Sequence, residues 1–254
     1  MAAPIIMVHG AFCGGWVFET FAAPFAAAGH EVLTPDLRGH GAGERRDAAT
    51  GLSMADYAQD IAQLAESLPE PPILIGHSMG GLVCQMAASR ARVRALALLA
   101  PSAPWGVTGN TVEEAVTAFG LHLMGPFWTQ AVEPDLNLMR QYSLSRLPRA
   151  EREAAIARLR PESGRALWET LNWWLDPFMT TSVSLAGRGC PSLALVGEKD
   201  VVHPPATVRQ TAARLGAGCE VLPGMSHWLV GEPGWRDVSA RLLDWMDREV
   251  RAAA

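Results

Sequence analysis

The chain has 254 residues, a length that fits one α/β domain with an insertion or two small domains. Apolar residues make up 49% of it, which is ample for a large core, and the formal net charge is −5 at pH 7. This acidic balance argues against nucleic acid or an anionic membrane as the partner. No apolar run reaches membrane-spanning length and no charged leader segment opens the chain, so we expect a cytoplasmic protein with no membrane partner.

The cysteines predict neither a disulfide framework nor a metal site. All four are scattered along the chain without a C-x-x-C pair, so we expect free thiols. The spacing of His and Cys fits no zinc pattern. We therefore expect no metal and no cofactor.

Short apolar strands alternate with helices through the first hundred residues. We expect strands at 4–8, 31–34, 72–75 and 95–99, and helices at about 16–28, 54–68 and 82–90. Ser53 is the expected N-cap of the second helix, with Asp56 three positions on. This alternation predicts a parallel sheet with right-handed crossovers and helices on both faces.

The alternation stops after about residue 101 and resumes near 187. Between these points we expect helices at 112–123, 126–131, 149–159 and 163–175, and this region holds five of the nine tryptophans. We predict a helical cap over the site, in which most aromatics form the cap's own core and two or three line a pocket. The sheet then continues with strands at 192–196 and 219–222 and helices at 205–215 and 235–249. The predicted division is a core of residues 1–107 and 187–254 with a cap of 108–186.

A Gly-x-Ser-x-Gly pattern surrounds Ser78, with an expected strand before it and an expected helix after it. The strained turn that such a serine adopts leaves no room for side chains on its neighbours, and Gly76 and Gly80 meet that need. This geometry lifts the Ser78 hydroxyl above the sheet and points the Met79 amide toward the same space. The alternative is a glycine-rich turn that merely packs.

A serine hydroxyl needs a base, and the base needs an orienting carboxylate. His227 lies in a glycine-rich loop after the last expected strand, where such a base belongs. Asp200 follows the strand at 192–196, whereas no Asp or Glu follows the strand that ends at Leu99. Glu198 follows the same strand, but the Gly-x-x-Asp-x-x-x-Pro turn around Asp200 resembles the acid loop of the α/β-hydrolase superfamily. This resemblance implies Asp200 as the acid and leaves Glu198 to solvent. The alternative for Asp200 is a residue that balances the dipole of the next helix.

The order Ser78, Asp200, His227 resembles that of the α/β-hydrolase superfamily, and the resemblance covers nearly the whole chain. It implies the α/β-hydrolase fold, with a mostly parallel sheet of about six strands, helices on both faces and a helical cap insertion. His9-Gly10-Ala11 resembles the family's oxyanion loop, which implies the amides of Ala11 and Met79 as the oxyanion hole.

The segment from His9 to Leu37 is most similar to a small plant-type group that holds methyl salicylate esterases and hydroxynitrile lyases. The lyases carry a polar residue where this chain has Gly10 and a lysine where it has Trp228, and both departures favour ester hydrolysis. Ser78 at the nucleophile position argues against haloalkane dehalogenase or epoxide hydrolase chemistry, which needs a carboxylate.

The resemblance implies a serine hydrolase that acts through an acyl-enzyme on a small ester-like substrate: a carboxylic ester, lactone or thioester with an apolar or aromatic acyl group. Trp228 also occurs in relatives that cleave carbon–carbon bonds. A carbon–carbon hydrolase, a hydroxynitrile-lyase-like lyase and a non-catalytic small-molecule binder therefore remain as alternatives. We expect a monomer or homodimer.

Overall fold

The computed structural model describes residues 2–108, 126–184 and 189–250. Its main sheet has six parallel strands in the order β2-β1-β3-β4-β7-β8. The strands are β1 (Ile5–Val8), β2 (Val32–Leu33), β3 (Ile73–His77), β4 (Ala95–Leu99), β7 (Ser192–Gly197) and β8 (Gly218–Leu222). The predicted six-stranded parallel sheet is confirmed.

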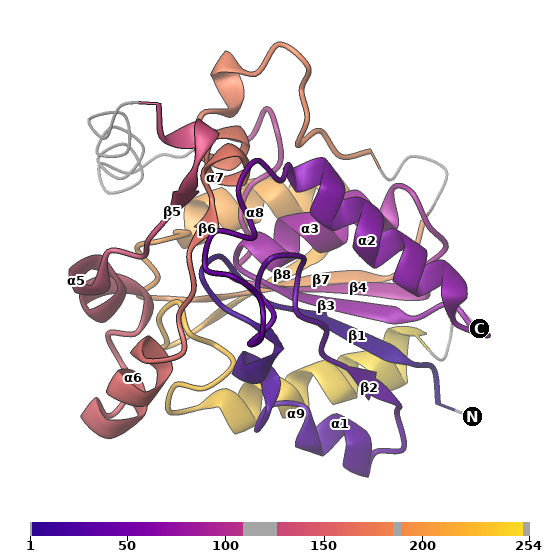
Figure 1. Ribbon diagram of the computed structural model, residues 1–254. Helices are drawn as coiled ribbons and strands as arrows, with labels where there is room; N and C mark the ends of the chain where they lie inside the picture. Colours follow the sequence, from indigo (N-terminus) through magenta and orange to yellow (C-terminus); the bar gives the residue numbers. More distant parts are fainter. Residues whose placement is uncertain (1, 109–125, 185–188, 251–254) are drawn as a thin grey trace.

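Helices cover both faces of this sheet (Figure 1). On one face lie α1 (Ala23–Ala27) and α9 (Trp235–Trp245), and on the other lie α2 (Met54–Ser67), α3 (Met79–Ala88) and α8 (Pro205–Leu215). Successive residues of each strand point to opposite faces of the sheet, so the protein has one hydrophobic core on each face. In β1, Ile5 and Met7 pack into one core, and Ile6 and Val8 pack into the other. In the described part of the chain, we find no helix with the length and apolar character needed to cross a bilayer.

The prediction of a single helix at about 16–28 is wrong. Residues 16–28 form a 3-10 turn at Gly15–Phe18 and the separate short helix α1, in which Pro24 lies at the second position. Proline has no amide hydrogen and its ring clashes with the preceding turn, so a continuous helix cannot run through it, whereas the start of a helix accepts it.

The segment between β4 and β7 lies past the carboxyl ends of the strands (Figure 1). It contains α5 (Leu136–Leu138), α6 (Arg149–Ile156) and α7 (Gly164–Leu171), and an antiparallel pair of two-residue strands, β5 (Ala131–Val132) and β6 (Glu162–Ser163). The strand pair was not expected. The expected helix at 126–131 is only a 3-10 turn at Phe127–Thr129, and the one at 163–175 ends as an α-helix at Leu171. The expected helix at 112–123 lies outside the described residues, and the boundaries of the cap stay a prediction.

Polar contacts fasten this inserted segment to the start of α2. Ser53 caps α2 in a capping box with Asp56, as predicted. The buried Glu169 carboxylate on α7 accepts hydrogen bonds from the Ser53 hydroxyl and the Met54 amide, at 2.9 and 2.8 Å. The Ser163 hydroxyl donates to the Leu52 carbonyl. These contacts hold the inserted segment against the core beside the carboxyl ends of the strands.

Candidate active site

Ser78 occupies the sharp turn between β3 and α3. Its backbone has φ 54° and ψ −124°, a left-handed conformation that costs an ordinary side chain strain energy. The turn is tight enough that a Cβ on Gly76 would lie 2.4 Å from the Gly80 carbonyl oxygen, and one on Gly80 would lie 2.2 Å from the Val8 carbonyl oxygen. Only glycine fits at these two positions, so the pattern around Ser78 is a steric requirement of the turn.

A chain of hydrogen bonds joins the three residues predicted to form a triad. His227 Nε2 lies 3.0 Å from Ser78 Oγ, and His227 Nδ1 lies 2.9 Å from Asp200 Oδ2. They come from the turn after β3, the loop after β7 and the loop after β8, and meet because the carboxyl ends of parallel strands share one edge of the sheet. With Nδ1–H donating to Asp200, the Nε2 lone pair accepts from the Ser78 hydroxyl.

Asp200 is buried and held from several directions. Its Oδ1 accepts hydrogen bonds from the Val202 and His203 amides at 2.8 and 2.9 Å. Burial alone would raise the pKa of Asp200, but the charge of His227 and the hydrogen bonds outweigh it and hold the pKa below its usual value. Glu198 is exposed and accepts from the Gly224 amide at 2.9 Å, away from the His227 ring.

The loop after β1 lies directly against Ser78. A Cβ on Gly10, the residue before Ala11, would come within 2.9 Å of Ser78 Cβ. The described hydrogen bonds assign no partner to the Ala11 amide. Met79 is the first residue of α3, where an amide has no partner within the helix. The two amides predicted to bind an oxyanion therefore belong to the residue after Ser78 and to the residue after Gly10, which lies against Ser78.

Two histidines flank the His227 ring, with centroids 5.1 Å away at the buried His77 and 5.2 Å away at His203. Burial, reinforced by the charge of His227, lowers the pKa of His77 to about 3 and that of His203 to about 4. His77 Nε2 pairs with the His227 carbonyl at 2.9 Å, and His203 Nε2 pairs with Ser102 Oγ at 2.9 Å. Both rings are neutral at pH 7, so they position His227 without adding positive charge beside it.

These pKa values predict a loss of stability in acid. His9, His77 and His203 are neutral in the folded protein, with pKa values of about 4, 3 and 4 against an ordinary 6.5, so the unfolded chain binds more protons below pH 6.5. Each should lower the free energy of unfolding by roughly 2 kcal/mol between pH 6.5 and pH 5. His40, whose pKa is raised, acts oppositely: its contribution is complete below pH 6.5 and is lost as pH rises through its folded pKa.

Urea unfolding between pH 8 and pH 5 measures how the free energy of unfolding depends on pH. The free energy of unfolding should be greatest above pH 6.5, because the three histidines with lowered pKa outweigh His40 at that pH, and it should fall toward pH 5; His203→Asn should reduce the acid slope by about one proton. A free energy that stays constant from pH 7 to pH 5 contradicts the assignment of three neutral histidines.

The loop that carries His227 has an anchor that the sequence did not reveal. Glu232 is fully buried, and its two carboxylate oxygens accept from the Ser226 amide and the Ser226 hydroxyl, both at 2.6 Å. This bidentate contact fixes the residue directly before His227. No spacing pattern marks a lone glutamate six residues from its partner, and His203, whose contact with Ser102 spans 101 residues, gave no signal either.

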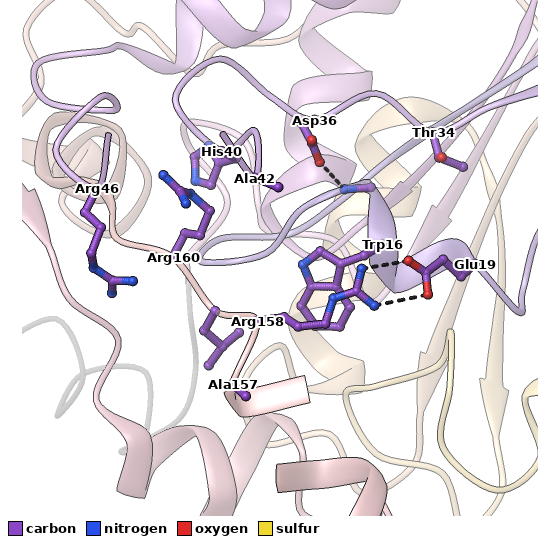
Figure 2. A pocket seen from close by; sticks show the side chains of 12 residues that line it. Trp16, Glu19, Thr34, Asp36, His40, Ala42, Arg46, Ala157, Arg158 and Arg160 are labelled. Carbon is purple, nitrogen blue, oxygen red and sulfur yellow. Dashed lines mark hydrogen bonds and ion pairs between the residues drawn. The ribbon is translucent and has the colours of Figure 1, made fainter. Parts of the chain in front are cut away.

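An open cavity of about 480 Å³ lies between the segments that follow β1 and β2 and residues 157–160 of the inserted segment (Figure 2). Its lining includes Trp16 and three arginines, but no member of the triad. Arg46 pairs with Glu133, and Arg158 pairs with Glu19 and lies over the Trp16 ring. Two of the arginine charges are thus already paired, which leaves the Ser78 region as the better candidate for chemistry. Within the described ranges, no cluster of three His, Cys, Asp or Glu side chains could hold a metal ion.

Comparison with known sequences agrees with this geometry. The profile described as the Alpha/beta hydrolase family matches residues 5–239. The chain belongs to the alpha/beta hydrolase family. Its six-stranded parallel sheet and its serine at the tip of a strand-to-helix turn are the features by which that fold is recognised.

Among relatives in this family, similarity to the plant esterase group is confirmed. The chain is 35% identical to methylesterase 3 of Arabidopsis thaliana over 85 residues, which are 33% of this chain and 32% of that protein. It is also 35% identical to the carbendazim hydrolyzing esterase of Nocardioides sp. over 101 residues, 38% of this chain and 41% of that one. These matches span less than half the length of each relative.

The fold likeness extends further. The crystal structure of a methylesterase from Arabidopsis superposes with a TM-score of 0.74, covering 97% of this chain and 99% of that one at 20% identity. At that identity the superposition establishes the common fold.

Proposed function

We propose that this alpha/beta hydrolase is a serine esterase in which Ser78, His227 and Asp200 form the catalytic triad. The observation that carries the proposal is the continuous hydrogen-bond chain from Asp200 Oδ2 through His227 to Ser78 Oγ. The relatives named methylesterase 3 and carbendazim hydrolyzing esterase support the same reaction class.

The chemistry follows from these contacts in two steps. His227 Nε2 takes the hydroxyl proton as Ser78 Oγ attacks the ester carbonyl, and Asp200 holds the His227 tautomer and stabilises the imidazolium. The amides of Ala11 and Met79 bind the oxyanion. His227 returns the proton to the departing alcohol, and water then attacks the acyl-enzyme with His227 again as base.

Side chains of the inserted segment pack against the oxyanion loop. Phe127, Val132 and Leu167 form a small buried apolar cluster, and Ala11, Phe12 and Trp168 each pack against it. This apolar wall next to the proposed oxyanion donors favours a small apolar or aromatic acyl group as the substrate moiety.

Trp168 should therefore influence acyl selectivity. Trp168→Ala opens space at the apolar cluster against which Ala11 also packs, and should raise the rate on bulky relative to small acyl esters by about tenfold, since pocket volume discriminates at this level. The matched control is Trp174→Ala, because Trp174 is 56% exposed. The measurement is the ratio of the rates on nitrophenyl benzoate and nitrophenyl acetate. If this ratio is unchanged in Trp168→Ala, or changes equally in Trp174→Ala, Trp168 does not influence acyl selectivity.

Turnover of a short aryl ester by purified protein tests the proposed reaction against its alternatives. Hydrolysis of nitrophenyl acetate is expected, with no cleavage of mandelonitrile. Cleavage of mandelonitrile without ester hydrolysis would indicate a hydroxynitrile-lyase-like lyase. Cleavage of a ring-fission substrate at a carbon–carbon bond without ester hydrolysis would indicate a carbon–carbon hydrolase. Tight binding of such esters without turnover would indicate a binder.

A further inference from the structure

Glu162 is a fully buried carboxylate in β6 that the proposed mechanism does not use. Its Oε1 accepts from the Tyr57 hydroxyl at 2.7 Å and from the Ser163 amide at 2.8 Å. Its Oε2 accepts from His40 Nε2 at 3.0 Å and from the Phe12 amide at 3.3 Å. One carboxylate thus joins the inserted segment to α2, to the loop after β2 and to the loop beside Ser78.

The partners of His40 define its charge. Its Nδ1 faces the Arg38 carbonyl oxygen at 3.2 Å, while its Nε2 faces the Glu162 carboxylate, and both of these groups only accept hydrogen bonds. Both ring nitrogens must therefore carry hydrogen, which makes His40 an imidazolium. Burial alone would lower the pKa of His40 and raise that of Glu162. Their mutual attraction and hydrogen bonds outweigh burial, so the pKa of His40 is raised and that of Glu162 is lowered.

The oxyanion loop, residues 10–13, is held on both sides of Ala11. Before it, the Gly10 carbonyl accepts from His9 Nδ1 at 2.8 Å. After it, Phe12 has a left-handed backbone with φ 65°, and its amide donates to Glu162 while its carbonyl accepts from the Arg160 amide at 2.9 Å. A non-glycine residue keeps such a conformation only where its surroundings impose it.

We infer that Glu162 is a positioning residue, which holds Phe12 in its left-handed conformation so that the Ala11 amide points at the developing oxyanion. The inference rests on the proposed function, which gives Ala11 that role. An oxyanion donor acts by being fixed before the reaction begins, so a carboxylate that secures the adjacent peptide acts on the transition state more than on substrate binding.

Glu162→Gln tests this with little change of shape. Tyr57 and Ser163 both donate to Oε1, so the amide oxygen of glutamine belongs there. The NH2 group then replaces Oε2, where a neutral His40 accepts from it but the Phe12 amide loses its acceptor. We expect kcat for an aryl ester to fall by about 10- to 100-fold with KM changed less than threefold. Phosphonylation of Ser78 by a fluorophosphonate, whose P=O oxygen occupies the same hole, should slow by a similar factor.

The matched control is Glu169→Gln. Glu169 is also a buried carboxylate of the inserted segment that bonds to the start of α2, but its described contacts are with Ser53, Met54 and Arg165 and none is with the oxyanion loop. Glu169→Gln should lower the melting temperature about as much as Glu162→Gln does. Its rates of ester turnover and of phosphonylation should both stay within about threefold of wild type. A second variant, Glu162→Asp, keeps the charge that His40 requires but withdraws the carboxylate from Phe12, and should also slow both reactions.

These variants separate the possible outcomes. A folded Glu162→Gln or Glu162→Asp that reacts as fast as wild type overturns the inference, as does an equal slowing in Glu169→Gln. If Glu162→Gln does not fold, the rates of Glu162→Asp test the inference in its place. Wild-type protein that a fluorophosphonate does not label at Ser78 refutes the proposed function itself, before Glu162 is tested.

Discussion

Ser78→Ala is expected to lower ester turnover by at least about 10³-fold while leaving the fold intact, because the hydroxyl that attacks the carbonyl is gone. Alanine keeps the Cβ that the turn already accommodates, so the melting temperature should change little. Nitrophenyl ester kinetics and thermal melting measure both effects.

Ser102→Ala is the matched control for this prediction. Ser102 is a buried serine that also pairs with a histidine, but its partner is His203 rather than His227. Its removal should change turnover by less than about tenfold. If Ser78→Ala retains turnover within tenfold of wild type, or Ser102→Ala is the inactive variant, the nucleophile is misassigned.

Asp200→Asn is expected to lower turnover by on the order of 10³- to 10⁴-fold. Asparagine keeps the side-chain shape, but its amide favours the wrong His227 tautomer and cannot stabilise the imidazolium. The control is Glu198→Gln in the same loop, on an exposed side chain that should lose little activity. Both variants are compared by kcat on one ester; a crippled Glu198→Gln, or an active Asp200→Asn, contradicts the acid assignment.

The sequence predicted the features that depend on local steric rules. The turn around Ser78 needs glycine at fixed offsets, and buried parallel strands appear as apolar runs, so the sheet and the positions of Ser78, Asp200 and His227 past strand ends could be predicted. The helix at 16–28 was wrong because its apolar pattern outweighed the single breaker, Pro24.

Contacts between distant residues could not be predicted in this way. Glu162 is separated by 122 residues from His40 and by 150 from Phe12, and it lies in a two-residue strand that is too short to show a periodic pattern. His203 was missed for the same reason, since its partner Ser102 is 101 residues away, and Glu232 was missed because no spacing pattern marks a glutamate six residues from Ser226. The positioning contacts around the triad therefore needed the structure.

The most direct test of the central claim is to locate the nucleophile chemically. Purified wild-type protein is treated with a fluorophosphonate, digested and mapped by mass spectrometry while ester turnover is followed in parallel. We predict a single adduct on Ser78, with turnover lost in proportion to labelling. An adduct on another residue that accounts for the loss, or full ester turnover by protein in which Ser78 is completely labelled, would contradict this account.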